Sequence, residues 1–364
     1  MSEQTDTALP QAGASTPRAA QIAAIARAYA PLEPSQSYTA DPFRPEDAPG
    51  IARLFYGAYG DRFPIDYVYD PQAIVALNTG PDLYHVVGRT PRGDIVAVCG
   101  LYRNPPGTGI MESGSTIVDP NYSAGKLLLR MQEMVNRDLP RTLGLNALFG
   151  QSVCDHLVTQ KLCVRFAARP YALELGALAP RPEERDYGSR ERVSLLDAVQ
   201  VFEDIPHAVH LPAIYRDCLE PLYARHGLQR TILPDCEPSR DVTEAAIARY
   251  PDSGMIKMTV VRLGRDVPER IQHLTEDDSA PQVLHLVLPL TEPGVAEAVA
   301  AARAQGFFLG GLLPLWNDRD MLLMQRLACP FDPARIKLLT DDAKALLDAI
   351  LADREQVRAR LAGA

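Results

Sequence analysis

Cysteine is scarce in this sequence and shows no metal-binding or disulfide pattern. The 364 residues contain six cysteines, and no two of them form the CxxC pair that is typical of zinc ribbons and redox motifs. We therefore expect reduced thiols and no metal site. The first residues, 1–7, are polar and acidic, whereas a secretory signal starts with basic and then apolar residues. These features favour a cytoplasmic protein.

Long apolar runs and an excess of positive charge are also missing. No apolar segment reaches the roughly 18 residues that a membrane-spanning helix needs. Lys and Arg total 37 against 46 Asp and Glu, which gives a net charge of -9. Nucleic acids and anionic membranes attract clusters of positive side chains, so neither is an expected partner. A neutral or cationic small substrate fits this charge balance better.

The length and the changes in composition predict two domains with tails. At roughly 100–200 residues per domain, 364 residues are enough for two. Residues 1–37 are rich in Ala, Pro, Ser, Thr and Gln, which predicts a disordered tail with at most a short helix at 19–29. The stretch 179–190 carries two prolines, a glycine and many charges, as linkers do. The expected parts are a first domain at 38–180, a linker at 181–191, a second domain at 192–330 and a C-terminal helical tail at 331–364.

Hydrophobic periodicity predicts an α+β fold in both halves. Apolar residues at offsets of three and four predict a helix over 51–59, and Asp70 is the expected N-cap of the next helix. Two β-rich runs, 84–89 and 95–102, flank a Pro/Gly/Asp turn and predict a hairpin. Further segments of the first half predict strands at 109–118 and 147–153 and helices at 127–137 and 155–166. Because strands and helices recur over 192–327, we expect a mostly antiparallel sheet flanked by helices in each domain.

A strand, a short loop and a helix follow one another in Ile117-Val-Asp-Pro-Asn-Tyr-Ser-Ala-Gly-Lys-Leu-Leu128. This segment is similar to the phosphate loop of the GCN5-related N-acetyltransferase (GNAT) superfamily. In that family a strand ending in Val-x-Pro leads into an Arg/Gln-x-x-Gly-x-Gly/Ala loop, whose amides and following helix hold the pyrophosphate of acetyl-CoA. The resemblance covers roughly 38–178 and, more faintly, 193–327, as in tandem-GNAT proteins.

The resemblance implies an acyl-CoA-dependent N-acyltransferase that works by direct attack in a ternary complex. Acetyl-CoA or another acyl-CoA is the implied co-substrate, and the acceptor is an amine of a small molecule or a protein. The backbone of Ile117 and Val118 is the implied partner of the pantetheine arm. The implied phosphate loop consists of Ser123, Ala124, Gly125, Lys126 and Leu127. The protein is expected to be a monomer or a homodimer.

The loop also departs from the family pattern. Ser123 and Lys126 stand where the family carries Arg or Gln and a glycine, and Gly125 lies one place from the usual glycine. Lys126 fits a contact with a phosphate, and it equally fits a loop that no longer closes on CoA. A catalytically degenerate GNAT-like protein that binds a ligand or a partner therefore stays an alternative.

Three side chains are candidates for catalysis, since amine acylation needs a base and an acid. Glu112 lies on the strand before the loop, where the resemblance places a catalytic carboxylate; the alternative is a strand-end carboxylate in water. His156 is the second catalytic candidate, and Gln160 is a candidate for binding the cofactor. Their i, i+4 spacing puts both side chains on one helix face, where both could line the cleft. Either His156 lines the cleft or it caps the helix. Tyr171 is close to the position of the family's thiolate-protonating tyrosine, although Pro170 breaks the helix expected there.

Overall fold

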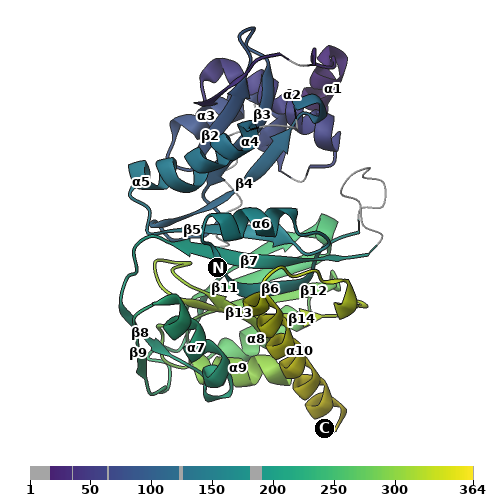
Figure 1. The fold of residues 1–364 in the computed structure, drawn as a ribbon. Helices are drawn as coiled ribbons and strands as arrows, with labels where there is room; N and C mark the ends of the chain where they lie inside the picture. The colour runs from purple at the N-terminus through teal and green to yellow at the C-terminus, as the bar shows by residue number, and fades with distance from the viewer. Residues whose placement is uncertain (1–16, 35, 64, 123–125, 181–190, 364) are drawn as a thin grey trace. The chain divides into compact units, whose positions relative to one another are not determined.

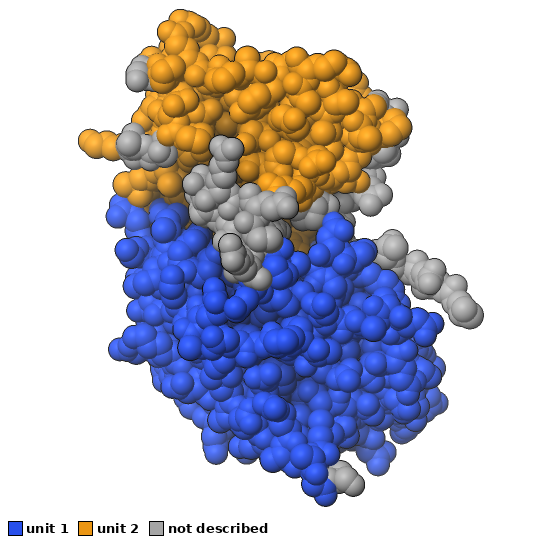
Figure 2. Space-filling model, turned by 90° about the vertical axis from the view of Figure 1, so that its right-hand side faces the viewer, with its two compact units in different colours: residues 1–6, 106–110, 149–364 blue, residues 7–105, 111–148 orange. Residues whose placement is uncertain are grey.

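The computed structural model describes residues 17–34, 36–63, 65–122, 126–180 and 191–363, which form two compact units. Unit 2 consists of residues up to 105 and 111–148, and unit 1 holds residues 106–110 and 149–363 of the described chain (Figures 1 and 2). In the described residues, no helix is both long enough and apolar enough to cross a membrane. Each unit is described below by itself.

Unit 2 contains one antiparallel sheet with the strand order β1-β2-β3-β4. Its helices and strands are α1 (Arg18–Ala28), β1 (Thr39–Pro42), α2 (Ala48–Tyr59), α3 (Pro71–Thr79), β2 (Leu83–Arg89), β3 (Ile95–Tyr102), β4 (Ile110–Val118), α4 (Leu127–Glu133) and α5 (Leu139–Leu143). The predicted hairpin is confirmed, with β2 and β3 joined by the turn at 90–94. Asp70 caps α3 as predicted, because its carboxylate accepts from the amides of Gln72 and Ala73.

Helices cover both faces of this sheet. Side chains of α2 and α3, such as Phe55 and Ile74, pack with Leu83, Val87 and Val98 on one face. The other face packs against α4 and the residues after it, with Val86, Cys99, Leu101, Leu127 and Met131 in the core. Alternate residues of a strand point to opposite faces, so both faces of β2 and β3 are apolar.

The helix that begins at Leu127 continues through a π-helical turn, η4 (Met134–Asp138), into α5. Pro140 explains the wider turn, since it has no amide hydrogen and its ring crowds the carbonyl four residues earlier. Within this segment the side chain of Asn136 donates to the Gln132 carbonyl at 2.9 Å. The helical segment therefore extends beyond the predicted end at 137.

Unit 1 is built on a mostly antiparallel sheet with the strand order β5-β7-β6-β13-β14-β12-β11-β10. Its strands are β5 (Ala147–Val153), which starts in unit 2, β6 (Arg169–Leu178), β7 (Val193–Val201), β10 (Glu244–Tyr250), β11 (Met255–Arg262), β12 (Val283–Pro289), β13 (Phe308–Leu313) and β14 (Met321–Leu327). β11 and β12 run parallel. A separate parallel pair is formed by β8 (His207–His210) and β9 (Arg230–Leu233). The α+β class with mostly antiparallel sheets is confirmed.

Five helices complete unit 1 in the described part of the chain: α6 (Val158–Arg165), α7 (Arg216–His226), α8 (Val267–Thr275), α9 (Val295–Ala304) and α10 (Asp341–Ala362). Helix α10 packs against β6 and β13. Its start is fixed by Thr340, whose hydroxyl accepts from the Ala343 amide. The C-terminal helix predicted from Asp341 is thus present.

The compact units divide the chain at 148/149 and not at the predicted linker, of which 181–190 lie outside the described residues. The reason is strand β6, which the sequence analysis missed. It comes from the predicted first domain, yet it pairs with β7 and β13 from the predicted second domain. One sheet in unit 1 therefore draws strands from both halves of the sequence.

The short helix that the sequence predicts at 19–29 within the N-terminal segment is present as α1 (Arg18–Ala28). Helix α1 packs on the core of unit 2 through Ile22 and Ile25. Arg18 forms an ion pair with Asp66 and lies 4.8 Å from the ring centroid of Tyr69. These contacts partly bury apolar surface of α1 against unit 2. Residues 1–16 lie outside the described residues.

Candidate active site

The strongest candidate site in unit 2 surrounds the carboxylate of Glu112 on β4. Only 5% of this residue is exposed. The register of β3 and β4 places Tyr102 directly opposite Glu112. The Tyr102 hydroxyl donates to one carboxylate oxygen, and the Asn104 amide donates to the other. Glu112 is therefore buried and held in one orientation, rather than lying at a strand end in water.

Two backbone features of β4 make room for this arrangement. A Cβ atom at Gly114 would lie 3.0 Å from the Tyr102 ring and hydroxyl, so glycine lets the ring lie across the strand. Next to it, the register with β3 shifts by one residue, and Ser115 has a φ of 55°. Such a bulge redirects side chains, and bulges are frequent beside active sites. Ser115 also forms a hydrogen bond with the buried Tyr67.

The two phenols of this cluster stay protonated over the usual pH range. Burial raises the pKa of Tyr102 well above its usual value, and the charge of Glu112 raises it further. Burial likewise raises the pKa of Tyr67, and Glu112 adds to that effect. Hydroxyl groups that keep their protons can donate hydrogen bonds to the Glu112 carboxylate. The site thus holds a buried and oriented carboxylate, a group of the kind that serves as a general base in enzymes.

The residues implied for CoA binding differ in their exposure. Ile117 is buried in the core beneath α2 and α3, and Leu127 is buried against the other face of the sheet. Their side chains serve packing in the core of unit 2. Lys126 is exposed at the start of α4; its carbonyl accepts from the Arg130 amide at 3.0 Å, and its side chain makes no hydrogen bond or ion pair with the described residues. Val118 is half-buried, and Ser123, Ala124 and Gly125 lie outside the described residues.

His156 and Gln160 belong to unit 1 and have structural partners there. The ring of His156 accepts from the Val158 amide at 3.3 Å, which fits a helix cap. Gln160 is 2% exposed. Its amide donates to the Lys337 carbonyl at 2.8 Å, and its oxygen accepts from the Leu339 amide at 2.9 Å. Both ends of the Gln160 side chain are bound to the backbone, which fits a structural role better than the predicted cofactor role.

Tyr171 also lies in unit 1, on strand β6 and not on a helix. It is 1% exposed, and its ring centroid is 4.6 Å from that of His226. Burial raises the pKa of the Tyr171 phenol, and the charge of Asp320 raises it further. A buried phenol with a raised pKa, next to the structural pair Asp320 and Arg230, fits a packing role better than the predicted acid.

The predicted site residues are therefore distributed over two units. Unit 2 holds Glu112, Ile117, Val118, Lys126 and Leu127, and unit 1 holds His156, Gln160 and Tyr171. The sequence analysis missed Tyr67, Tyr102 and Asn104, which surround Glu112. Tyr102 was visible as the last residue of a predicted strand, but its pairing with Glu112 depends on the loop length and the bulge.

The second half has a loop at the corresponding strand-to-helix junction, residues 263–266 between β11 and α8. Its backbone amides already have partners in segment 240–243. Arg265 donates to the Arg240 carbonyl at 3.0 Å, Asp266 donates to the Asp241 carbonyl at 3.1 Å, and Gly264 donates to the Thr243 hydroxyl at 3.1 Å. A loop with its donors used in this way offers no amides to a phosphate.

Among the described residues, no group of three or more His, Cys, Asp or Glu side chains is placed to hold a metal ion. His207 and His210, at a spacing typical of helical metal ligands, lie on strand β8. There they have separate partners, with His207 bonded to the Ile205 carbonyl and His210 to the Pro234 carbonyl.

Comparison with known proteins gives no match to a family model and none to a curated protein. Solved structures do match. A ribosomal-protein-S5-alanine acetyltransferase from Vibrio fischeri is 12% identical, with a TM-score of 0.37, over 48% of this chain and 98% of that chain. An N-acetyltransferase from Staphylococcus aureus Mu50 is 12% identical, with a TM-score of 0.38, over 45% and 98%. A spermidine N-acetyltransferase from Vibrio cholerae is 11% identical, with a TM-score of 0.34, over 45% and 93%.

These three proteins are acetyltransferases. Another match is described as an acetyltransferase of the GNAT family. All of these TM-scores lie below 0.5 and all identities below 25%. Similarity at this level carries no argument about the function of this chain.

Proposed function

We propose that this protein is an acyl-CoA-dependent N-acyltransferase in which Glu112 removes a proton from the acceptor amine. The observation that carries the proposal is the buried Glu112 carboxylate, oriented by Tyr102 and Asn104. The resemblance of residues 117–128 to a GNAT phosphate loop supports it. The acceptor is an amine of a small molecule or a protein.

The chemistry requires a base because an amine is a nucleophile only when it is neutral. An alkyl ammonium group has a pKa of about 10.4, so at neutral pH almost every acceptor carries the extra proton. A carboxylate held within reach takes that proton, and such general-base help is worth about 10²–10⁴-fold in rate. The acyl-CoA, when bound, supplies the activated acyl group. Tyr102 and Asn104 hold the Glu112 carboxylate in one orientation, so that it can accept the proton from the ammonium group.

Lys126 and the loop before it are the proposed anion-binding part. The Lys126 side chain is exposed and has no hydrogen-bond or ion-pair partner among the described residues, so its ammonium group is available to a phosphate. The corresponding loop of the second half, 263–266, has its amides occupied. We therefore assign acyl-CoA binding to the first half of the chain.

Two measurements test the proposal. Calorimetric titration with acetyl-CoA should show binding for the unmodified protein and weaker binding for Lys126→Ala, by at most about 100-fold, since a charged hydrogen bond contributes roughly 1.5–3 kcal/mol. Lys161→Ala, which removes an exposed lysine of α6, should bind normally. In a thiol-release assay with a broad amine panel, Glu112→Gln should lose about 10²–10⁴-fold in kcat while still binding acetyl-CoA.

A second function is favoured by one feature of the loop. Ser123 and Lys126 replace the Arg or Gln and the glycine of the family pattern, which fits a degenerate protein that binds a ligand or a partner without catalysis. Binding of acetyl-CoA without turnover of any amine in the panel would favour this second function. No binding at millimolar acetyl-CoA would remove the enzymatic proposal.

A further inference from the structure

A β-bulge in strand β4 of unit 2 involves two residues with hydroxyl groups. The register with β3 passes from Gly114 directly to Ile117, so Ser115 and Thr116 together oppose a single residue of β3, Cys99. A bulge of this kind redirects the side chains of the residues that form it. The bulge therefore decides where the hydroxyl groups of Ser115 and Thr116 point.

These two hydroxyl groups serve opposite faces of the sheet. The Ser115 side chain bonds with Tyr67, which belongs to the core beneath α2 and α3. The Thr116 hydroxyl accepts from the side-chain amide of Gln132 at 3.0 Å, and Gln132 belongs to α4 on the other face. Thr116 is exposed, whereas Gln132 is only 5% exposed. Thr116 is therefore a surface side chain that is held by a buried one.

The orientation of the Gln132 side chain is fixed by Asn136, one turn further along the helix. The side-chain nitrogen of Asn136 donates to the Gln132 backbone carbonyl at 2.9 Å, and a carbonyl can only accept. The same nitrogen donates to the side-chain oxygen of Gln132 at 3.0 Å. The side-chain nitrogen of Gln132 therefore faces Thr116, whose oxygen must be the acceptor.

The proton of the Thr116 hydroxyl is consequently left for another partner. A threonine hydroxyl that accepts one hydrogen bond still donates its own proton. In the described part of the chain, the Thr116 hydroxyl has the hydrogen bond from Gln132 and no acceptor for this proton. The series Asn136, Gln132 and Thr116 thus presents one oriented donor at the surface of β4.

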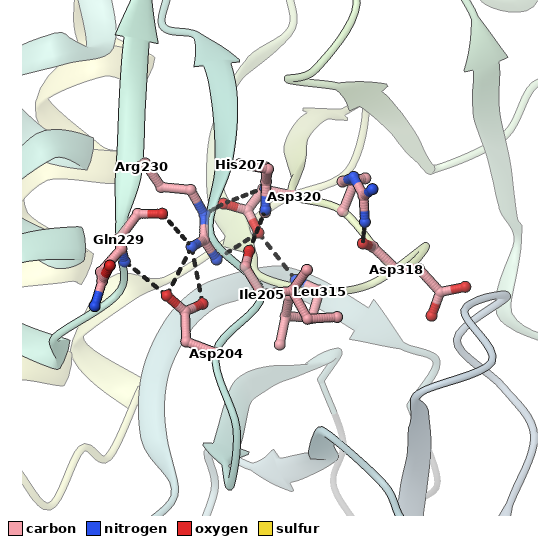
Figure 3. A network of polar contacts seen from close by, with 9 residues as sticks. Asp204, Ile205, His207, Gln229, Arg230, Leu315, Asp318 and Asp320 are labelled. Carbon is pink, nitrogen blue, oxygen red and sulfur yellow. Dashed lines mark hydrogen bonds and ion pairs between the residues drawn. The ribbon is translucent and has the colours of Figure 1, made fainter.

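A buried polar network in unit 1 differs in this respect, because its donors end on acceptors inside the protein. Figure 3 shows Arg230 between two carboxylates. Arg230 donates to Asp204 at 2.8 Å, to Asp320 at 2.6 and 3.2 Å, and to the Gln229 carbonyl at 2.8 Å. Such a closed network serves the packing of its unit. The open donor of Thr116 is instead available to a ligand.

We infer that the Thr116 hydroxyl donates a hydrogen bond to an amide carbonyl in the arm of acyl-CoA, with Gln132 and Asn136 as its positioning residues. This inference rests on the proposed function, in which the phosphates bind near Lys126 at the start of α4 and the acyl group reaches Glu112 on β4. Thr116 lies on β4 and is bonded to α4, so it lies between these two ends. The arm that joins the phosphates to the thioester carries amide groups, whose carbonyls accept such a bond.

Thr116→Val tests the donor, because it keeps the shape of the side chain and removes the hydroxyl group. Calorimetric titration should show acetyl-CoA binding weakened by about 3–10-fold, the effect of one neutral hydrogen bond. Thr116→Ser keeps the donor and should bind within about twofold of the unmodified protein. Thr79→Val, which changes an exposed threonine of α3, is the matched control and should bind normally.

Gln132→Glu tests the positioning role while keeping a hydrogen bond between the two side chains. A carboxylate accepts from the Thr116 hydroxyl, so the threonine proton turns away from the ligand. At about pH 8, which favours an ionised carboxylate, acetyl-CoA should bind roughly tenfold more weakly. Adding Thr116→Val to Gln132→Glu should cause no further loss, because the donor is already withdrawn. Should Gln132→Glu fail to fold, Thr116→Val, a change at an exposed position, decides alone.

Failure of the inference can be told apart from failure of the proposed function. If Lys126→Ala weakens acetyl-CoA binding while Thr116→Val does not, the inference is wrong and the proposed function is retained. ADP has the pyrophosphate of CoA without the arm, so equal losses of ADP and acetyl-CoA binding in Thr116→Val would show a general disturbance and also overturn the inference. If acetyl-CoA does not bind to the unmodified protein, the proposed function fails and the inference fails with it.

Discussion

The hydroxyl group of Tyr102 is one of the groups that orient the Glu112 carboxylate. Glu112 is 5% exposed, and burial of a carboxylate is costly unless hydrogen bonds replace the lost water. The Tyr102 hydroxyl and the Asn104 amide are the replacements that the structure shows. Because Gly114 leaves the Tyr102 ring its space, removal of the hydroxyl alone does not disturb the packing.

Tyr102→Phe should therefore lower the free energy of unfolding by about 2 kcal/mol, the usual contribution of a hydrogen bond to a charged group. Urea unfolding followed by circular dichroism measures this change. Tyr84→Phe is the control, since Tyr84 lies in the same hairpin, is half-buried, and its hydroxyl makes no hydrogen bond with the described residues. A loss in Tyr102→Phe no larger than in the control would show that the hydroxyl does not hold Glu112.

Among the elements, helix α6 is linked by the side chain of Gln160 to the segment that precedes α10. Gln160 binds the backbone of Lys337 and Leu339, and the Lys337 amide also donates to the Cys154 carbonyl at 2.7 Å. The segment that precedes α10 is thus attached to α6 and to the end of β5. These bonds are partly buried, so the backbone groups would lack partners if Gln160 were shortened.

Gln160→Ala should destabilise the protein by roughly 2–3 kcal/mol and accelerate hydrogen exchange at the Leu339 amide. Urea unfolding and exchange measured by nuclear magnetic resonance check both parts. Gln272→Ala, on the exposed face of α8, replaces a surface glutamine and should change stability by less than about 0.5 kcal/mol. Normal exchange at Leu339 in Gln160→Ala would contradict this account of α6.

At the scale of the whole molecule, three buried or partly buried histidines determine how the free energy of unfolding changes in mild acid. Burial lowers the pKa of His85 to about 3 and that of His226 to about 4, and it also lowers the pKa of His285. An unfolded histidine has a pKa of about 6.5. Below pH 6.5 the unfolded chain therefore binds protons that the folded chain does not, and stability falls with pH.

Carboxylates act at lower pH. Burial alone would raise the pKa of Asp318, but the hydrogen bonds from Gly109 and Thr108 outweigh it and hold the pKa below its usual value. The same balance, with His207 and Arg230 as partners, lowers the pKa of Asp320. Their contribution is fully present above the unfolded pKa of about 3.9 and is lost as the pH falls below it. Between pH 6.5 and 4.5 the histidines dominate.

We expect the urea midpoint to fall steadily from pH 7 to pH 5. His85 alone should contribute about 2 kcal/mol of this loss between pH 6.5 and 5, at about 1.4 kcal/mol per pH unit. His85→Gln should flatten the dependence by that amount while leaving the other histidines in place. A midpoint that is the same at pH 7 and pH 5 would contradict the proton-binding argument.

Much of the local structure follows from the sequence alone. The hairpin of β2 and β3, the cap at Asp70, strand β5 and helix α10 lie where the sequence predicts them. Each depends on signals within about ten residues: alternating apolar residues, a Pro/Gly/Asp turn, or a capping side chain before a helix. The sequence also predicted the α+β class with mostly antiparallel sheets.

The tertiary structure decided which distant segments meet. The pairing of β6 with β7 and β13, which places the unit boundary at 148/149, has no local signal, because strand order depends on burial across the whole sheet. The bulge at Ser115 and the pairing of Tyr102 with Glu112 depend on register. Asp318 and Thr108 are 210 positions apart, yet they bind each other directly. Residue types thus determined what each segment forms, and the packing of the sheets determined which side chains share a site.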